Sequence, residues 1–485
     1  MELIERIDHW GRTTPDHPAY ISGGRTLTYG ELCRRSDVLA AHLAASLPEK
    51  APVVVLGHKE PELLIAYLGA IKSGRAYVPV DTAVPPQRIE RIRAVSGAPL
   101  ILSPEKVAEL SSGRAAAPPW RLGTHDHYYI MFTSGSTGEP KGVPITYGCL
   151  QSFLRWILAE HAFLEGREVF LNVVPYSFDV SVMDTYPALV TGGTVTSVSK
   201  TELANPRQLY QLLAASALTT WVSTPSFAQM CLVEPTFNQG MLPLLRRFLF
   251  CGETLAPEVA SQLLDRFPAV EVWNTYGPTE ATVATTSLRI TRAVLEKYSP
   301  LPIGYPMAGS RVLVMDDQRR ELPAGERGEI IISGPNVSPG YLNRPELTET
   351  AFFHQNGQRA YRTGDWGRYR DDMLFFEGRI DNQVKLNGYR IEPADVEANL
   401  RALAGVRDAV VLPVLRQGAV DSLAAFVILN ERPARTDFQL ACDLKVQLTE
   451  HLPAYMIPRR FSFLETFPMN TNGKADRRRL AEVLT

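Results

Sequence analysis

Short apolar runs alternate with helical patterns along most of the chain, and this alternation limits the folds that it can adopt. Strands are predicted at 52–57, 76–80, 99–102, 128–132, 169–174, 219–223, 247–251 and 270–273. Helices are predicted between them at 61–72, 85–95, 147–161, 184–190, 206–215 and 257–267. Because strand, helix and strand in succession form a right-handed parallel unit, the pattern predicts a doubly wound, largely parallel sheet.

The pattern changes after the last of these strands. The runs 311–315 and 328–333, with turn residues after each, predict a small antiparallel β-rich part. A domain boundary is predicted at Asp381, which divides the 485 residues into domains 1–380 and 381–485. In the second domain, helices are predicted at 393–403 and 440–451, and strands at 408–414, 423–429 and 460–464. The fold class is therefore α/β: a large N-terminal domain of doubly wound mixed sheets, with the β-rich part, and a small α+β C-terminal domain.

Composition excludes several classes of function. Lysine and arginine number 50 against 52 aspartates and glutamates, and no basic stripe indicates nucleic acid or a membrane surface. The five cysteines are scattered without a CxxC pair, which argues against a disulfide framework and a zinc site. The first residues do not have the pattern of a signal peptide, and no apolar run reaches membrane-spanning length. We expect a cytoplasmic enzyme or binding protein.

A glycine-rich loop, TSGSTGEPKG at 133–142, follows the predicted strand 128–132. Glycines let backbone N–H groups approach an anion, hydroxyls donate further hydrogen bonds, and Lys141 adds charge, so the loop is typical of a phosphate-binding site. It is not a Walker A motif, because Pro140 and Gly142 flank the lysine. The alternative is a flexible Gly/Ser linker.

Four further segments carry polar residues suited to nucleotide chemistry. They are NTYGPTE at 274–280, YRTGD at 361–365, GRIDNQVKLNGYR at 378–390 and PMNTNGK at 468–474. Tyrosine can stack on a base, glutamate can hold Mg²⁺, and a carboxylate at a strand end suits a ribose diol. Each segment alone could equally be a turn, and a lysine beside Arg477, Arg478 and Arg479 could be a solvated charge.

Taken together, in this order and spacing, the five segments resemble the adenylate-forming superfamily of acyl-CoA synthetases, luciferases and peptide-synthetase adenylation domains. LTYGEL at 27–32 and GAIKSGRAYVPVD at 69–81 extend the resemblance over nearly the whole chain. It implies that a carboxylate attacks the α-phosphate of ATP, forming an acyl-adenylate and pyrophosphate, and that the acyl group then passes to a thiol. It also implies a mobile C-terminal domain that closes for the first step and rotates for the second.

The resemblance assigns roles by matching position. The β- and γ-phosphates would lie on Thr133, Ser134, Gly135, Ser136, Thr137, Gly138 and Lys141. Adenine and the α-phosphate would lie on Asn274, Thr275, Tyr276, Gly277, Pro278 and Thr279, with Mg²⁺ on Glu280. Asp365 would bind the ribose, flanked by Phe376, Glu377, Gly378 and Arg379. Lys474 would be catalytic, bridging the substrate carboxylate and the α-phosphate. Asp381 would be the hinge, and Gly388 would border the thiol channel.

The substrate pocket matches the amino-acid branch of the superfamily. In PYSFDVS at 175–181, Asp179 would pair with the α-ammonium of the substrate; the alternative is that it caps a helix that begins at Val180. The matching lining positions are Val180, Met183, Ser223, Leu249, Cys251, Thr275, Val283 and Ala284. None of them is charged, and Met183 and Leu249 are bulky, so a small uncharged side chain is expected.

Within this branch, 178–186, 248–253 and 274–284 are most similar to enzymes that load D-alanine onto a carrier protein for teichoic acid D-alanylation. The resemblance gives Cys251 and Met183 the role of shaping a pocket for D-alanine, and Cys251 is not expected to be a nucleophile. The thiol would be phosphopantetheine on a separate carrier, or coenzyme A, since no residues remain for a carrier domain. Alternatives are an adenylation enzyme for a small L-amino acid (alanine, serine or proline) and an inactive nucleotide-binding regulatory protein.

Overall fold

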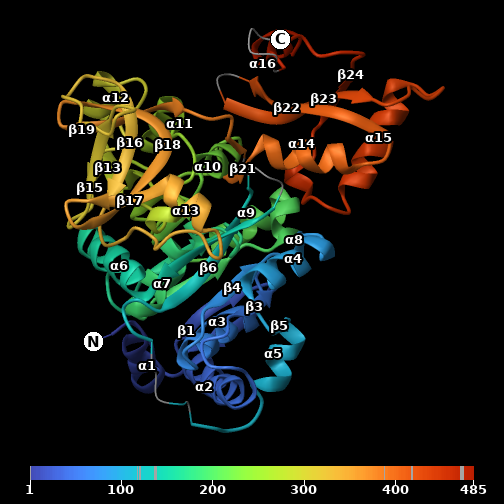
Figure 1. Ribbon diagram of the computed structural model, residues 1–485. Helices are drawn as coiled ribbons and strands as arrows, with labels where there is room; N and C mark the ends of the chain where they lie inside the picture. The colour runs from blue at the N-terminus through green and yellow to red at the C-terminus, as the bar shows by residue number, and fades with distance from the viewer. Residues whose placement is uncertain are drawn as a thin grey trace. The chain divides into compact units, whose positions relative to one another are not determined.

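The computed structural model describes residues 2–116, 118, 122–135, 139–386, 388–416, 419–469 and 475–484. They form two compact units (Figure 1). The first unit holds 1–81, 95–131 and 143–380, and the second holds 82–94, 132–142 and 381–485. The second unit therefore takes in two segments that the sequence analysis assigned to the N-terminal domain, and the domain division 1–380 and 381–485 stays a prediction.

A nine-stranded sheet forms the largest part of the first unit. Its order is β14 (Tyr305–Pro306), β13 (Thr286–Ile290), β12 (Glu271–Tyr276), β11 (Arg247–Phe250), β10 (Thr220–Ser223), β8 (Val169–Asn172), β9 (Thr194–Ser197), β1 (Pro18–Ser22) and β2 (Arg25–Thr28). The six strands from β12 to β1 run parallel, and antiparallel strands complete both edges. The central strands are buried, as expected for parallel strands covered on both faces.

Two further sheets contain the other strands of this part of the chain. One has the order β5 (Leu100–Leu102), β3 (Val53–Leu56), β4 (Tyr77–Val80), β6 (His127–Thr133) and β7 (Lys141–Thr146), and its β5, β3, β4 and β6 run parallel. The other is antiparallel, with β15 (Arg311–Met315), β16 (Gly328–Ser333), β18 (Gln358–Arg370) and β17 (Phe352–Gln355) in order, and β19 (Met373–Arg379) paired with β18. These sheets, together with the helices between the strands, confirm the predicted α/β class.

Helices connect the strands. They are α1 (Leu3–Thr13), α2 (Tyr29–Ser46), α3 (Glu62–Lys72), α4 (Pro86–Ser96), α5 (Pro104–Leu110), α6 (Tyr147–His161), α7 (Val180–Thr191), α8 (Lys200–Ala204), α9 (Pro206–Ala215), α10 (Pro225–Cys231), α11 (Pro257–Arg266), α12 (Arg292–Lys297) and α13 (Pro345–Ala351). Local sequence fixes several starts; at α2, Thr28 accepts from the backbone N–H of Glu31 while the Glu31 carboxylate accepts from that of Thr28. No helix of the described ranges is long and apolar enough to cross a membrane.

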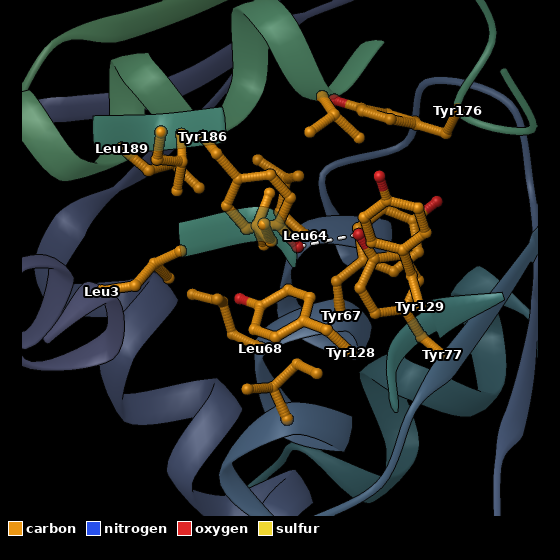
Figure 2. Close-up of a cluster of buried hydrophobic side chains, with 14 of the residues drawn as sticks. Leu3, Leu64, Tyr67, Leu68, Tyr77, Tyr128, Tyr129, Tyr176, Tyr186 and Leu189 are labelled. Atoms are coloured by element: carbon orange, nitrogen blue, oxygen red, sulfur yellow. Dashed lines mark hydrogen bonds between the residues drawn. The ribbon is translucent and has the colours of Figure 1, made fainter. Parts of the chain in front are cut away.

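Several tyrosines lie in the core of the first unit. Figure 2 shows Tyr67, Tyr77, Tyr128 and Tyr186 packed together among leucines, and the Tyr77 and Tyr186 hydroxyls are 2.8 Å apart. The Tyr67 and Tyr77 rings stack with centroids 4.2 Å apart, and Tyr128 meets Tyr186 edge to face. These rings bury a large area and interlock α3, β4, β6 and α7.

The second unit carries the C-terminal segment. It has a hairpin of β20 (Val384–Leu386) and β21 (Tyr389–Ile391), and a sheet of β22 (Val406–Arg416), β23 (Ala419–Leu429) and β24 (Arg460–Phe463). Its helices are α14 (Pro393–Ala402), α15 (Asp437–Leu448) and α16 (Arg477–Glu482). Helix α15 begins three residues before the predicted start because Thr436 and Gln439 form a capping box. Within this unit, Arg88 of α4 pairs with the fully buried Asp395 of α14 at 3.0 Å.

Two other boundaries differ from the prediction in ways that affect the site. Helix α7 begins at Val180, four residues early, because the Val182 N–H reaches the Asp179 carbonyl at 2.9 Å and closes a first turn. Strand β12 continues to Tyr276, three residues beyond the predicted end. Its backbone pairs with β13 there, in the register Tyr276 to Thr286, a tertiary contact that no local pattern indicates.

Candidate functional site

The apolar lining positions predicted for a pocket lie together in the first unit. Val180, Met183, Leu249, Cys251, Val283 and Ala284 belong to one buried cluster. Ser223 and Thr275 are also buried, and the Thr275 hydroxyl donates to the Phe250 carbonyl at 2.8 Å. The sequence prediction of an uncharged lining therefore corresponds to one region at the ends of β10, β11 and β12 and the start of α7.

Cys251 lies directly after β11 and is 1% exposed. Its thiol donates to the Val283 carbonyl at 3.6 Å. Such a buried thiol acts as a small hydrophobic group, and it contacts another lining residue. The role of Cys251 in shaping the pocket stays a prediction.

Asp179 is half-buried and directly precedes α7. It occupies the N-cap position of α7, as the alternative expected, but its side chain makes no capping hydrogen bond. The buried Tyr129 lies near it: burial raises the pKa of Tyr129, and the Asp179 charge raises it further. Asp179 thus places a carboxylate beside an apolar region, where a cationic ligand group would find a partner.

The segment 274–280 differs from its predicted form. Asn274, Thr275 and Tyr276 are the last residues of β12, whereas a position after the strand was expected. The Asn274 amide donates to the Pro302 carbonyl at 2.9 Å, so this group is engaged in the fold. At Gly277 a Cβ would lie 2.6 Å from the Ala284 backbone, which explains why glycine stands there. Pro278 and Thr279 follow and are half-buried.

Tyr276, Asp365 and Arg379 form a buried polar cluster. The Tyr276 hydroxyl donates to Asp365 Oδ2 at 2.5 Å, and Arg379 Nη1 lies 2.6 Å from Asp365 Oδ1. Burial raises the pKa of Tyr276, and the Asp365 carboxylate raises it further. A carboxylate accepts up to about four hydrogen bonds, so Asp365 keeps the capacity to bind a diol as well.

The position of Asp365 also corrects a prediction. It lies inside β18, where a strand end was expected, at a register irregularity between Asp365 and Gly367 opposite β19. Such a bulge redirects a side chain within a sheet. On β19, the Phe376 ring lies 6.2 Å from that of Tyr276, Glu377 pairs with Arg368 at 2.5 Å, and Gly378 has a φ of +101°.

Glu280 is fully buried, and its Oε1 accepts a hydrogen bond from the Tyr341 hydroxyl at 2.8 Å. Among the described residues, no group of three metal-ligating side chains surrounds it. A nucleotide-bound Mg²⁺ needs only one or two protein carboxylates, because phosphates and water complete its shell. The donor set at Glu280 therefore fits such an ion.

Part of the glycine-rich loop is described in the second unit. The Ser134 hydroxyl donates to the Arg390 carbonyl and accepts from the Glu392 N–H, both at 3.0 Å. This serine therefore binds backbone of the C-terminal segment. At Gly135 a Cβ would lie 2.1 Å from the Glu139 carbonyl oxygen, so only glycine fits. Thr133 ends β6, Lys141 begins β7, and Ser136, Thr137 and Gly138 lie outside the described residues.

The remaining predicted residues belong to the C-terminal segment. Asp381 accepts from the Gln383 N–H at 3.1 Å, and Gly388 has a φ of +82° in the turn before β21. Lys474 lies outside the described residues. Arg477, close to it in the sequence, pairs with the buried Glu397 at 2.5 Å.

Sequence reasoning missed Tyr341, the hydrogen-bond partner of Glu280. The two residues are 61 positions apart, and a single tyrosine in a turn carries no recognisable pattern. It also missed the Pro302 carbonyl that engages Asn274, 28 positions away. Both contacts depend on the tertiary fold.

Comparison with known proteins gives full-length matches. A family model described as AMP-binding enzyme matches residues 7–342, and one described as AMP-binding enzyme C-terminal domain matches 395–474. Two proteins named D-alanine–D-alanyl carrier protein ligase, from Bacillus cereus (strain Q1) and Bacillus thuringiensis (strain Al Hakam), are each 44% identical over the whole of both chains. The structure of the Vibrio cholerae adenylation domain AlmE with glycyl-adenosine-5'-phosphate has the same fold, with a TM-score of 0.86, 24% identity, and coverage of 100% of this chain and 97% of that one.

Proposed function

The chain belongs to the AMP-binding enzyme family, and from this membership we propose that it is an AMP-forming ligase that activates D-alanine and transfers it to a carrier protein. The observation that carries the proposal is an uncharged, buried lining with one carboxylate beside it, in a chain that aligns end to end with ligases of that name. D-Alanine has a methyl side chain and an α-ammonium, which match the lining and Asp179 respectively.

The amino-acid end of the site supports this choice by size and charge. In a partly buried setting, a charge-assisted hydrogen bond between Asp179 and an ammonium is about twice as strong as a neutral one. Met183, Cys251 and Val283 are buried at 0–1% exposure and leave no charged partner for a charged side chain. Fatty acids and other acyl substrates lack the ammonium that Asp179 would bind.

The nucleotide end uses the remaining polar residues. Asp365, held by Tyr276 and Arg379, would accept the ribose hydroxyls, and Glu280 would hold Mg²⁺, which neutralises phosphate charge when bound. The loop 133–141 would bind the β- and γ-phosphates, with Asn274 to Thr279 near adenine and the α-phosphate. The Asn274 amide would act by fixing the end of β12, since it already binds Pro302.

The proposed reaction has two steps. A D-alanine carboxylate oxygen bonds to the α-phosphorus of ATP while the bond to pyrophosphate breaks. Then the deprotonated thiol of phosphopantetheine on the carrier bonds to the carbonyl carbon, and AMP leaves. Positioning and charge neutralisation dominate phosphoryl chemistry, and Lys474 would supply a cation between the two anions in the first step. Asp381 would be the hinge that lets the C-terminal segment serve both steps, with Gly388 at the thiol channel.

ATP–pyrophosphate exchange with a panel of D- and L-amino acids tests the proposal. We expect the highest kcat/KM with D-alanine, followed by transfer to a phosphopantetheinylated carrier protein detected by mass spectrometry. An L-amino acid preferred several-fold over D-alanine would refute the substrate assignment. Absence of exchange with every amino acid would refute the ligase itself.

A further inference from the structure

A buried lysine contacts the segment that carries Asp179. Lys59, three residues after β3, is 2% exposed. Its ammonium donates to the Val174 carbonyl and to Asn172 Oδ1, both at 2.5 Å. It also lies 4.6 Å from the centre of the Tyr176 ring, a cation–π distance. Two of its contacts, with the Val174 carbonyl and the Tyr176 ring, therefore lie within the segment 173–179.

A carboxylate balances this charge through an amide. Asn172 accepts from Lys59, and its amide nitrogen donates to both oxygens of Asp184 at 2.9 and 3.0 Å. Asp184 lies in α7, is fully buried and also accepts from the Thr185 hydroxyl. Burial lowers the pKa of Lys59 and raises that of Asp184, and attraction between the two opposes both shifts. A buried polar network thus links the residues after β3 with β8 and α7.

The segment 173–179 connects the residues that Lys59 contacts, Val174 and Tyr176, with Asp179. The Phe178 N–H donates to the Pro175 carbonyl at 3.0 Å, so residues 175–178 form one tight turn between Val174 and Asp179. On its other side, the Tyr176 ring meets Tyr67 edge to face, 5.5 Å between centroids (Figure 2). The backbone of Lys59 is itself fixed, because its carbonyl accepts from the Tyr20 hydroxyl at 2.9 Å. Movement at Val174 and Tyr176 would therefore displace the turn that precedes Asp179.

We infer that Lys59 is a positioning residue for the amino-acid site, whose ammonium holds Val174 and Tyr176 and so fixes the Asp179 carboxylate toward the substrate ammonium. The inference rests on the proposed function, since it requires Asp179 to bind the substrate. It assigns Lys59 no contact with the substrate itself. Nucleotide binding, which uses other residues, should not depend on Lys59.

The variant Lys59→Met keeps the length of the side chain and removes its charge. The variant loses the hydrogen bond from the ammonium to the Val174 carbonyl, and a hydrogen bond to a charged group is worth at least about one factor of ten. Because this bond holds the turn before Asp179, we expect the KM for D-alanine in pyrophosphate exchange to rise about tenfold or more. The KM for ATP should remain within about twofold. Lys72→Met is the matched control, because Lys72 is equally buried but pairs with Asp8 and Asp37, away from the segment. It should leave the KM for D-alanine unchanged.

A second variant separates positioning from folding. Lys59→Met leaves Asp184 without its counter-charge, whereas the double variant Lys59→Met with Asp184→Asn removes both charges and should recover most of the loss in the urea midpoint of unfolding. Because Val174 and Tyr176 stay unanchored, its KM for D-alanine should remain raised. Recovery of a wild-type KM together with stability would overturn the inference, as would a rise in the KM for ATP equal to that for D-alanine.

Wild-type exchange distinguishes failure of the inference from failure of the proposed function. If the wild type prefers another amino acid, the D-alanine assignment fails and the same split in KM is measured with that amino acid. If the wild type exchanges with D-alanine and Lys59→Met has an unchanged KM for it, only the inference is overturned. A wild type that is inert with every amino acid overturns both.

Discussion

His161, the last residue of α6, is a buried histidine that should make the protein sensitive to acid. Its side chain is 5% exposed, and its ring meets Trp273 edge to face at 4.7 Å. Neither ring nitrogen has a hydrogen-bond partner among the described residues. Burial and, to a smaller extent, the charge of Arg247 lower the pKa of His161 to about 3. The folded state therefore holds the neutral imidazole well below pH 6.5.

The sign and size of the effect follow from proton linkage. In the unfolded chain the imidazole binds a proton below about pH 6.5, while the folded state does so only near pH 3. The free energy of unfolding is therefore fully retained well above pH 6.5, and below pH 6.5 it falls by up to about 1.4 kcal/mol for each pH unit. Between pH 6.5 and 4.5 the loss due to His161 alone is about 2 kcal/mol, because the unfolded imidazole is already half protonated at pH 6.5.

His161→Phe keeps a planar ring against Trp273 and removes the titrating group. Urea unfolding of wild type and variant at pH 6.5 and 4.5 should show a pH-dependent loss smaller in the variant by about 2 kcal/mol. His42→Asn, which alters an exposed histidine, should leave the pH dependence unchanged. Equal losses in the wild type and in His161→Phe would show that His161 does not stay neutral in the folded state, and would refute the reasoning.

Three further predictions concern catalysis. Tyr276→Phe removes the hydrogen bond to the Asp365 carboxylate, and such a bond to a charged group contributes about 1.5–3 kcal/mol. It should therefore raise the KM for ATP roughly tenfold and leave the KM for D-alanine unchanged. The control Tyr369→Phe, on the same strand as Asp365, should change neither KM, and equal effects of the two variants would contradict the assignment. Cys251→Ala should enlarge the pocket and lower the D/L ratio of kcat/KM in pyrophosphate exchange; an unchanged ratio would remove Cys251 from the account of specificity. Lys474→Ala should abolish adenylate formation yet leave transfer from preformed D-alanyl-adenylate largely intact, and equal loss of both half-reactions in a folded variant would count against the two-step role of the C-terminal segment.

The α/β class could be predicted from the sequence because the strands correspond to short apolar runs. Segments such as 247–251 and 219–223 are buried on both faces in the structure, and a parallel strand of this kind leaves a clear pattern. The lining of the pocket stays a prediction, although Val180, Leu249 and Cys251 belong to one buried cluster. The confirmed fold class depends on local patterns and on family motifs of fixed spacing.

The sequence could not predict which distant residues form hydrogen bonds with the side chains of a motif. The Tyr276 hydroxyl binds Asp365, 89 positions away, a contact that the motif around Tyr276 does not indicate. The Ser134 hydroxyl binds backbone at 390 and 392, more than 250 positions away, which the glycine-rich motif does not indicate either. No motif indicates a role for Lys59, because its partner Val174 lies 115 positions further along the chain. A residue type and its neighbours do not determine such partners; the fold does.

The order of strands in the nine-stranded sheet has a consequence for synthesis of the chain. Strand β1 pairs with β9 through Tyr20 and Val195, which are 175 positions apart. At about 5–20 residues per second, the ribosome makes β9 roughly 9–35 s after β1, and the edge of β1 stays unpaired meanwhile. Completion of the sheet up to β14 takes longer still. The hairpin of β1 and β2 must therefore wait for the rest of the sheet, so folding of this unit is slow and late in translation.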